Sequence, residues 1–183
     1  MSWSTITAAQ VQPQRWKNDG GWTRELLAWP HLADWTVRIS VADIERDGPF
    51  SAFPGVQRWF GVLSGAGVRL YDFELHVGSE LLGFDGALAP DCELVDGATR
   101  DFNLMHRRDK GRLQVQAADE VPELPAGSVD WLGFFTSEGG VLTHGGRRMG
   151  LGAQTLAWCE QPVAQPLAFD GRGPAWWMSW SAA

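Results

Sequence analysis

Short runs in which apolar and polar residues alternate most restrict the fold of this chain. In residues 35–41 (WTVRISV) every second residue is apolar, whereas Arg38 and Ser40 fall on the opposite face, which is the period of a β-strand. Turns rich in glycine separate further short runs, and no segment carries a long apolar repeat of 3.6 residues. The pattern predicts an all-β fold, a sandwich or small barrel with little helix.

The run at residues 58–63 (RWFGVL) differs because both of its alternating faces are largely apolar. A strand that is apolar on both faces is expected to be buried on both, so Arg58 should lie in a cavity or at its mouth. A buried guanidinium loses its hydration and needs an anion in return. Further strands are expected at residues 23–29, 68–71, 101–107, 112–116, 131–136, 155–159 and 176–180.

Charge and composition exclude several classes of protein. The chain has 183 residues and a formal net charge of −7, and its densest basic stretch is residues 107–110, so no nucleic-acid interface is expected. No apolar run is long enough for a membrane helix, and the first twenty residues are too polar for a signal peptide. Cys92 and Cys159 are expected to be core residues without a disulfide. We therefore expect a cytoplasmic protein.

A weak internal repeat links the two halves of the chain. Gly67 and Val68 correspond to Gly140 and Val141 at an offset of 73 residues, and a second glycine follows each pair at a similar distance. Both copies combine a glycine turn with a returning strand. The spacing therefore favours two related β-units.

Three ordered blocks of sequence resemble the HutD family, also called the Ves family. Residues 16–25 (WKNDGGWTRE) are similar to its WKNGGGxTRE segment, with Asp19 where the pattern usually has Gly. The second block comprises residues 38–42 (RISVA) and 47–55 (DGPFSAFPG) with Arg58. The third comprises residues 84–86 (FDG), 94–97 (LVDG) and 101–108 (DFNLMHRR).

This resemblance implies a bicupin, in which one chain forms two small cupin-type β-barrels. On that basis we expect an N-terminal barrel with the ligand pocket in residues 1–115 and a C-terminal barrel in residues 116–183, and an exchange of terminal strands is left open. The family is associated with histidine utilisation, where HutD is thought to act as a regulator. A carboxylate of that pathway, such as urocanate or N-formylglutamate, is the implied ligand.

Neither metal nor nucleophile chemistry has support in the sequence. A mononuclear cupin metal site needs clustered imidazoles, but His31, His76, His106 and His144 are at least 30 residues apart. Neither cysteine has a nearby base, and the Gly-x-Ser-x-Gly pattern does not occur. We therefore predict no metal, no cofactor and no catalytic residue.

Cationic residues in the matched blocks carry the main hypothesis, an anion pocket in the N-terminal barrel. Guanidinium groups bind carboxylates through paired hydrogen bonds, and short polar side chains would complete such a site. The alternative is that Arg38 faces solvent and Arg58 pairs with Asp43, Asp47 or Asp101. The predicted ligand-binding residues are Lys17, Asn18, Thr23, Arg24, Arg38, Ser40, Arg58, Asn103, His106 and Arg107, with Trp16 and Trp22 as candidate walls.

Three functions follow from these observations. The first is a metal-free protein that binds a small carboxylate and regulates histidine catabolism. The second is an enzyme acting on a small acid, with His106 or Glu25 as proton carrier. The third is an interaction module in which exposed Trp176, Trp177 and Trp180 form a face for a homodimer or another partner. The binding protein is the interpretation we prefer.

Overall fold

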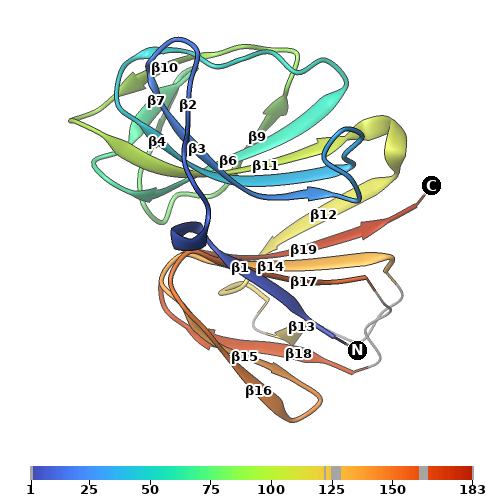
Figure 1. The fold of residues 1–183 in the computed structure, drawn as a ribbon. Helices are drawn as coiled ribbons and strands as arrows, with labels where there is room; N and C mark the ends of the chain where they lie inside the picture. Colours follow the sequence, from blue (N-terminus) through green and yellow to red (C-terminus); the bar gives the residue numbers. More distant parts are fainter. Residues whose placement is uncertain (1, 122, 125–128, 161–164, 183) are drawn as a thin grey trace. The chain divides into compact units, whose positions relative to one another are not determined.

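The structure, a computed structural model, describes residues 2–121, 123–124, 129–160 and 165–182 of the chain (Figure 1). Its regular elements are antiparallel β-strands, and the helical segments in these ranges are two three-residue 3-10 turns, Ala8–Gln10 and Arg108–Lys110. The prediction of an all-β fold is therefore confirmed. No helix in the described ranges has the length and apolar character needed to cross a membrane.

Contacts between Cα atoms divide the chain into two compact units. The first unit is Val11–Asp109, and the second unit joins Met1–Gln10 to Lys110–Ala183. Each unit contains two sheets, as in the double-sheet jelly rolls to which cupins belong.

The first unit carries a six-stranded sheet and a four-stranded sheet (Figure 1). The order in the larger sheet is β2 (Gln14–Arg15), β3 (Gly21–Trp29), β4 (Val37–Ile44), β11 (Thr99–Arg107), β6 (Val56–Ser64) and β9 (Leu82–Asp85). The smaller sheet has the order β5 (Gly48–Pro49), β10 (Asp91–Leu94), β7 (Val68–Leu70) and β8 (Phe73–Leu75).

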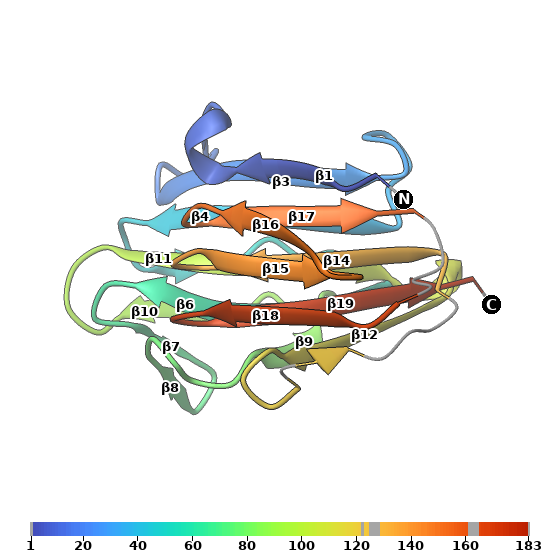
Figure 2. The ribbon, with the colours of Figure 1, turned by 90° about the horizontal axis from the view of Figure 1, so that it is seen from below.

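The second unit carries a five-stranded and a four-stranded sheet, and its strands β18 and β15 lie side by side in Figure 2. The larger sheet has the order β1 (Ser4–Thr7), β17 (Thr155–Cys159), β14 (Trp131–Thr136), β19 (Ala175–Ser181) and β12 (Arg112–Ala117). The smaller has the order β13 (Glu123–Leu124), β18 (Leu167–Gly171), β15 (Gly140–His144) and β16 (Arg147–Leu151).

The limits of the units differ from the expected boundary after residue 115. Residues 1–10 group with the C-terminal part because β1 pairs with β17, where Ser4 lies opposite Trp158. Residues 110–115 group with it because β12 pairs along β19. Long-range strand pairing, which sequence spacing does not reveal, decides both assignments.

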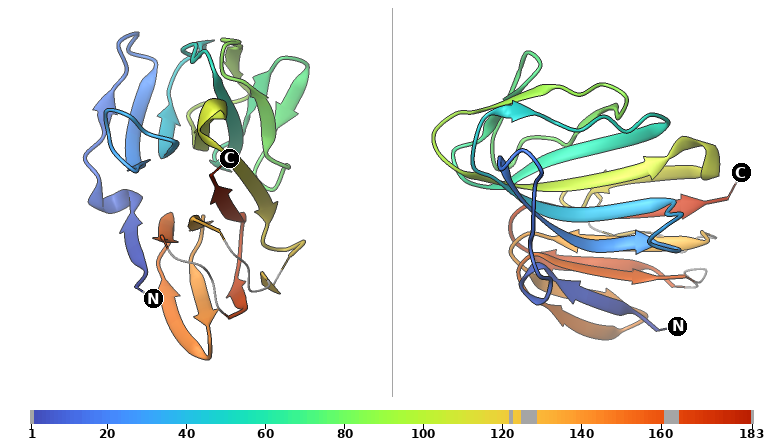
Figure 3. Two further views of the ribbon diagram at one scale, coloured as in Figure 1. Left: turned by 90° about the vertical axis from the view of Figure 1, so that its right-hand side faces the viewer. Right: turned by 45° about the horizontal axis from the view of Figure 1, so that its top comes forward.

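The strand order shows the internal repeat directly. Strands β4 to β11 recur as β12 to β19, so that the smaller sheets correspond strand for strand, β5-β10-β7-β8 with β13-β18-β15-β16. Gly67 and Gly140, paired from sequence spacing, stand at the starts of the corresponding strands β7 and β15. The orange hairpin of β15 and β16 can be followed in Figure 3. The structure therefore supports the repeat inferred from the sequence.

The interiors of the two units are filled differently. In the second unit, Phe134 and Trp177 lie opposite each other on β14 and β19 with ring centroids 4.3 Å apart, inside an aliphatic and aromatic core. The Trp177 indole donates a hydrogen bond to the carbonyl of Val121 at 2.8 Å. The corresponding strands of the first unit present Arg58 and Asn103 inward instead. The first unit therefore places polar side chains beside its apolar core, on strands whose counterparts in the second unit carry aromatic ones.

The C-terminal tryptophans do not form the exposed face that the interaction hypothesis requires. Trp176, Trp177 and Trp180 have relative exposures of 5%, 1% and 8%. Their position on β19, a central strand between β14 and β12, buries them. This corrects the expectation that they are exposed.

A side-chain hydrogen bond closes the turn after Trp16. Asp19 has φ = 56°, and the Asn18 side-chain oxygen accepts a hydrogen bond from the Gly20 N–H at 3.0 Å, as in an Asx turn. At Gly21 a Cβ atom would lie 2.2 Å from the backbone oxygen of Asp43. Glycine is therefore required there for β3 to approach β4 closely.

Candidate anion-binding site

A pocket of about 430 Å³ lies within the first unit. Its floor is the inner face of β4, β6 and β11, and residues of β2, β3 and of the segment from Pro49 to Phe53 surround it. This volume is in the range typical of small-molecule sites. The lining residues are Gln14, Arg15, Trp16, Lys17, Asn18, Thr23, Arg38, Ser40, Ala42, Pro49, Phe50, Ser51, Phe53, Arg58, Asp101, Asn103 and Met105.

Strand register brings the polar residues of the floor together. Ser40 on β4 lies opposite Asn103 on β11, and Met105 lies between Arg38 and Arg58 across the sheet. Side chains that alternate along each strand point to the same side of the sheet. The face predicted from alternation to carry Arg38 and Ser40 is therefore the face that lines the pocket.

Arg58 is the most deeply buried cation of the site. Its relative exposure is 3%, and its guanidinium carbon lies 5.1 Å, 5.6 Å and 5.0 Å from the ring centroids of Phe50, Phe53 and Phe84. One guanidinium nitrogen donates to the backbone oxygen of Ser51 at 3.3 Å, while the buried Nε has no hydrogen-bond partner in the described part of the chain. The three rings provide cation–π contact but do not neutralise the charge.

Asp101 is buried close to Arg58. Its relative exposure is 2%, and within the residues that the structure describes its Oδ1 has no hydrogen-bond partner. Burial raises the pKa of Asp101 to about 8, against the opposing influence of the Arg58 charge. Burial likewise lowers the pKa of Arg58 to about 10. Because a protonated Asp101 carries no charge, the floor of the pocket is cationic near neutral pH.

An unsatisfied acceptor lies beside these two groups. Among the described residues the buried side-chain oxygen of Asn103 has no hydrogen-bond partner, although buried polar atoms normally have one. Together with Arg58 Nε and Asp101 Oδ1, it gives the pocket three polar atoms that lack a hydrogen-bond partner among the described residues. A ligand with complementary groups would satisfy them.

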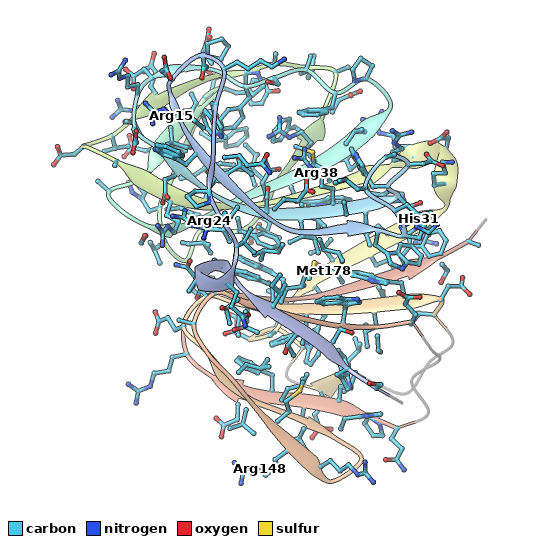
Figure 4. All side chains as sticks on the ribbon, in the orientation of Figure 1. Arg15, Arg24, His31, Arg38, Arg148 and Met178 are labelled. Carbon is cyan, nitrogen blue, oxygen red and sulfur yellow. The ribbon has the colours of Figure 1, made fainter. Side chains whose placement is uncertain are left out.

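Arg38 is held in position by Glu25. Its Nε donates to a carboxylate oxygen of Glu25, and the two side chains have relative exposures of 24% and 21%. Figure 4 labels Arg38 within the first unit. The pairing orients the guanidinium but occupies one edge of it, so Arg38 does not face solvent in the way the alternative interpretation required.

The rim of the pocket comes from the turn between β2 and β3. The Trp16 indole donates to the Thr23 hydroxyl at 2.7 Å, which fixes one wall. Lys17 and Asn18 are exposed at the rim, and within the described residues Lys17 forms no ion pair. Trp22, the other candidate wall, lies outside the pocket lining and donates instead to Glu45.

Three predicted site residues lie outside this pocket. Arg24 forms an ion pair with Asp43 at 2.6 Å. His106 is buried on the opposite face of β11 from Asn103, and burial lowers its pKa. Arg107, at the end of β11, approaches Asp34 at 3.4 Å and stacks on Trp35 at 5.1 Å. The remaining predicted residues, Lys17, Asn18, Thr23, Arg38, Ser40, Arg58 and Asn103, line the pocket, and their role in binding stays a prediction.

The sequence model of the family described as HutD matches residues 8–177, which is most of the chain. The chain belongs to the HutD family. This family is associated with histidine utilisation, and the resemblance inferred from three sequence blocks is confirmed. One relative, an uncharacterized 21.2 kDa protein in the hutC 3′ region of Pseudomonas putida, is 36% identical over 82% of this chain and 85% of its own length.

Solved structures support the same assignment of fold. HutD from Pseudomonas fluorescens SBW25 superposes over the whole of both chains with a TM-score of 0.81 and 22% identity. A mutant of Bacillus subtilis oxalate decarboxylase OxdC matches 98% of this chain and 77% of its own, with a TM-score of 0.60 and 9% identity. These matches confirm the bicupin fold expected for a HutD-family chain.

Sequence reasoning missed several lining residues of this HutD-family pocket. Asp101 and Met105 alternate with Asn103 on β11, so the period of the strand already placed them on the same face. The same period places His106 on the opposite face. Phe50 and Phe53 also lie against Arg58, but no sequence signal linked them to it.

The described residues contain no cluster of three or more His, Cys, Asp or Glu side chains suited to a metal ion. His106, the histidine nearest to the site in sequence terms, lies on the other face of β11. The expectation of a site without a metal or cofactor therefore stays a prediction for this HutD-family protein.

Proposed function

We propose that this HutD-family protein binds a small carboxylate in the pocket of the first unit and regulates histidine utilisation in response to it. The pathway acids urocanate and N-formylglutamate are the ligands to test first. The volume of about 430 Å³ is ample for either acid. In this proposal the chain acts as a sensor of metabolite level.

The environment of Arg58 is the observation that carries the proposal. A guanidinium that is 3% exposed, sits against three phenylalanines and forms no ion pair among the described residues has an unfavourable electrostatic energy. A ligand carboxylate would replace the lost hydration with charge-assisted hydrogen bonds. Asp43 could not do so, because it is engaged by Arg24 and Arg100.

The other polar groups favour a ligand that also carries an N–H or O–H group. Asn103 offers an unmatched oxygen, and Ser40 faces it across the sheet. Arg38 and Lys17 add positive charge between the floor and the rim. Urocanate, with an imidazole, and N-formylglutamate, with an amide N–H, both combine a carboxylate with such a donor.

Isothermal titration calorimetry with urocanate and N-formylglutamate tests this function. We expect saturable binding by the unmodified protein and a loss of at least about tenfold in affinity for Arg58→Met. Arg24→Gln is the matched control, because Arg24 lies outside the pocket and pairs with Asp43. Absence of heat with both acids, or equal weakening by both substitutions, would reject the proposal.

A further inference from the structure

A second cavity, of about 700 Å³, lies entirely within the second unit. It is formed between the β15–β16 hairpin, the residues that precede β1 and Gln165. Its lining residues are Ser2, Trp3, Leu142, His144, Gly145, Arg147, Arg148, Met149 and Gln165.

This cavity is not the repeat counterpart of the first pocket. By strand order β15 and β16 correspond to β7 and β8, and neither of those strands lines the pocket around Arg58. The interior that does correspond to that pocket is filled by Phe134 and Trp177. The second cavity is therefore a separate feature of the fold.

Register places apolar and cationic side chains on one face of the hairpin. His144 lies opposite Arg147, and Leu142 lies opposite Met149. Since side chains two residues apart share a face, all four point to the same side, and Leu142 and Met149 belong to or pack on the core of the unit. Arg148 falls on the other face, and Figure 4 labels it at the outer edge of the hairpin.

Two buried nitrogen atoms of the cavity have no hydrogen-bond partner in the described ranges of the chain. They are Trp3 Nε1 and His144 Nε2, and the two rings meet edge to face with centroids 6.4 Å apart at 74°. An indole N–H only donates hydrogen bonds, and an imidazole nitrogen donates when it carries the proton. Unsatisfied buried groups of this kind are costly, so the wall is suited to a ligand that accepts hydrogen bonds.

The positive charge of the cavity lining favours an anionic ligand. Among its described lining residues none is acidic, while Arg147 and Arg148 form no ion pair with any described residue. This is unusual in a chain of net charge −7. Two unneutralised guanidiniums near a tryptophan and apolar side chains favour an anionic group attached to a flat apolar body.

We propose that the second unit holds its own binding site for a small aromatic or similarly flat organic acid. In this site Arg147 and His144 bind the carboxylate, and the indole N–H of Trp3 donates to it. Leu142 and Met149 contact the apolar body. The site is independent of the pocket around Arg58 and gives the protein a second ligand.

Nuclear magnetic resonance of the full chain tests this site. Trp indole groups are labelled with ¹⁵N, and Trp3→Phe identifies the Trp3 resonance. Benzoate should shift that resonance saturably, and benzamide, which has the same shape without the charge, should bind at least about tenfold more weakly. Inorganic phosphate should likewise bind at least about tenfold more weakly, because it lacks the apolar body.

Two arginine substitutions in the second unit distinguish a specific site from general surface charge. Arg147→Gln should weaken benzoate binding at least about tenfold, whereas Arg172→Gln, at an exposed residue of the same unit outside the cavity lining, should change it less than about threefold. Arg38→Gln, in the first pocket, should leave the Trp3 response unchanged. No saturable shift, equal binding of benzamide or phosphate, equal effects of Arg147→Gln and Arg172→Gln, or loss of the response in Arg38→Gln would each overturn the proposal.

Discussion

Arg58 and Asp101 carry opposite formal charges in one buried pocket, yet the described ion pairs do not include one between them. Each is desolvated, and burial moves the pKa of each toward its neutral form. A direct ion pair between Arg58 and Asp101 would neutralise both charges and leave no charge for a ligand to bind. Left apart, the two groups form a site whose charge depends on pH and which an anionic ligand would complete.

Replacement of Arg58 should weaken carboxylate binding without lowering the stability of the folded protein. Arg58→Met keeps much of the volume and the contacts with Phe50, Phe53 and Phe84 while it removes a buried charge. We expect the free energy of carboxylate binding to weaken by about 1.4 kcal/mol or more, which is a tenfold loss of affinity, with no decrease in the free energy of unfolding, because an unpaired buried guanidinium is itself unfavourable. Calorimetry and urea unfolding measure the two effects. A large loss of stability would indicate that Arg58 has a structural role instead.

Asp101 should make the protein less stable as the pH rises. Its pKa is about 8 in the folded chain against 3.8 ordinarily, so between these values the folded state binds more protons than the unfolded state. The free energy of unfolding should therefore fall with pH over this window, by up to about 1.4 kcal/mol per unit. Urea unfolding at several pH values, compared with Asp101→Asn, isolates this contribution. Parallel pH profiles of the two proteins would contradict the prediction.

The same proton should govern ligand affinity. Below pH 8 a neutral Asp101 adds no negative charge to the pocket, whereas above it the carboxylate would repel a ligand carboxylate. Binding of N-formylglutamate should therefore weaken between pH 7 and pH 9, by at least about threefold. Asp101→Asn should keep the affinity at pH 7 and lose this dependence. Calorimetry at both pH values distinguishes the cases, and an unchanged profile in the variant would refute the role of Asp101.

His106 should influence stability in the opposite direction and leave binding alone. Burial lowers its pKa from 6.5, so below pH 6.5 the unfolded state binds the extra proton first and the free energy of unfolding falls as the pH falls. His106→Gln should remove this part of the acid sensitivity. Because His106 lies outside the pocket lining, urocanate affinity should change less than about twofold. A marked loss of urocanate affinity in His106→Gln would instead indicate that His106 takes part in binding.

Gly21 should tolerate no side chain. A Cβ there would lie 2.2 Å from the backbone oxygen of Asp43, so Gly21→Ala must push β3 away from β4. We expect a loss of about 3 kcal/mol or more in the free energy of unfolding. Gly150→Ala on β16 is the matched control, since a Cβ there meets nothing within 4 Å. Thermal unfolding of the two variants gives the comparison, and similar stability would contradict the close approach.

Much of the fold could be predicted because strands have a short local period. The expected strands at residues 131–136 and 155–159 coincide with β14 and β17. The same period determines which residues share a face. It therefore predicted that Arg38 and Ser40 lie together, and it also implied that His106 could not face the same way as Asn103.

Only the tertiary structure decided which of these faces meet and which charges are neutralised. The sequence by itself determined the strands, their faces, the internal repeat and the family of the chain. Pairing between strands far apart in the sequence places Arg58 beside Met105. The rings of Phe50 and Phe53 lie against the Arg58 guanidinium, and Asp43 forms an ion pair with Arg24. Alternation acts between neighbours in sequence, but desolvation and ion pairing depend on neighbours in space, and those are set when the sheets assemble.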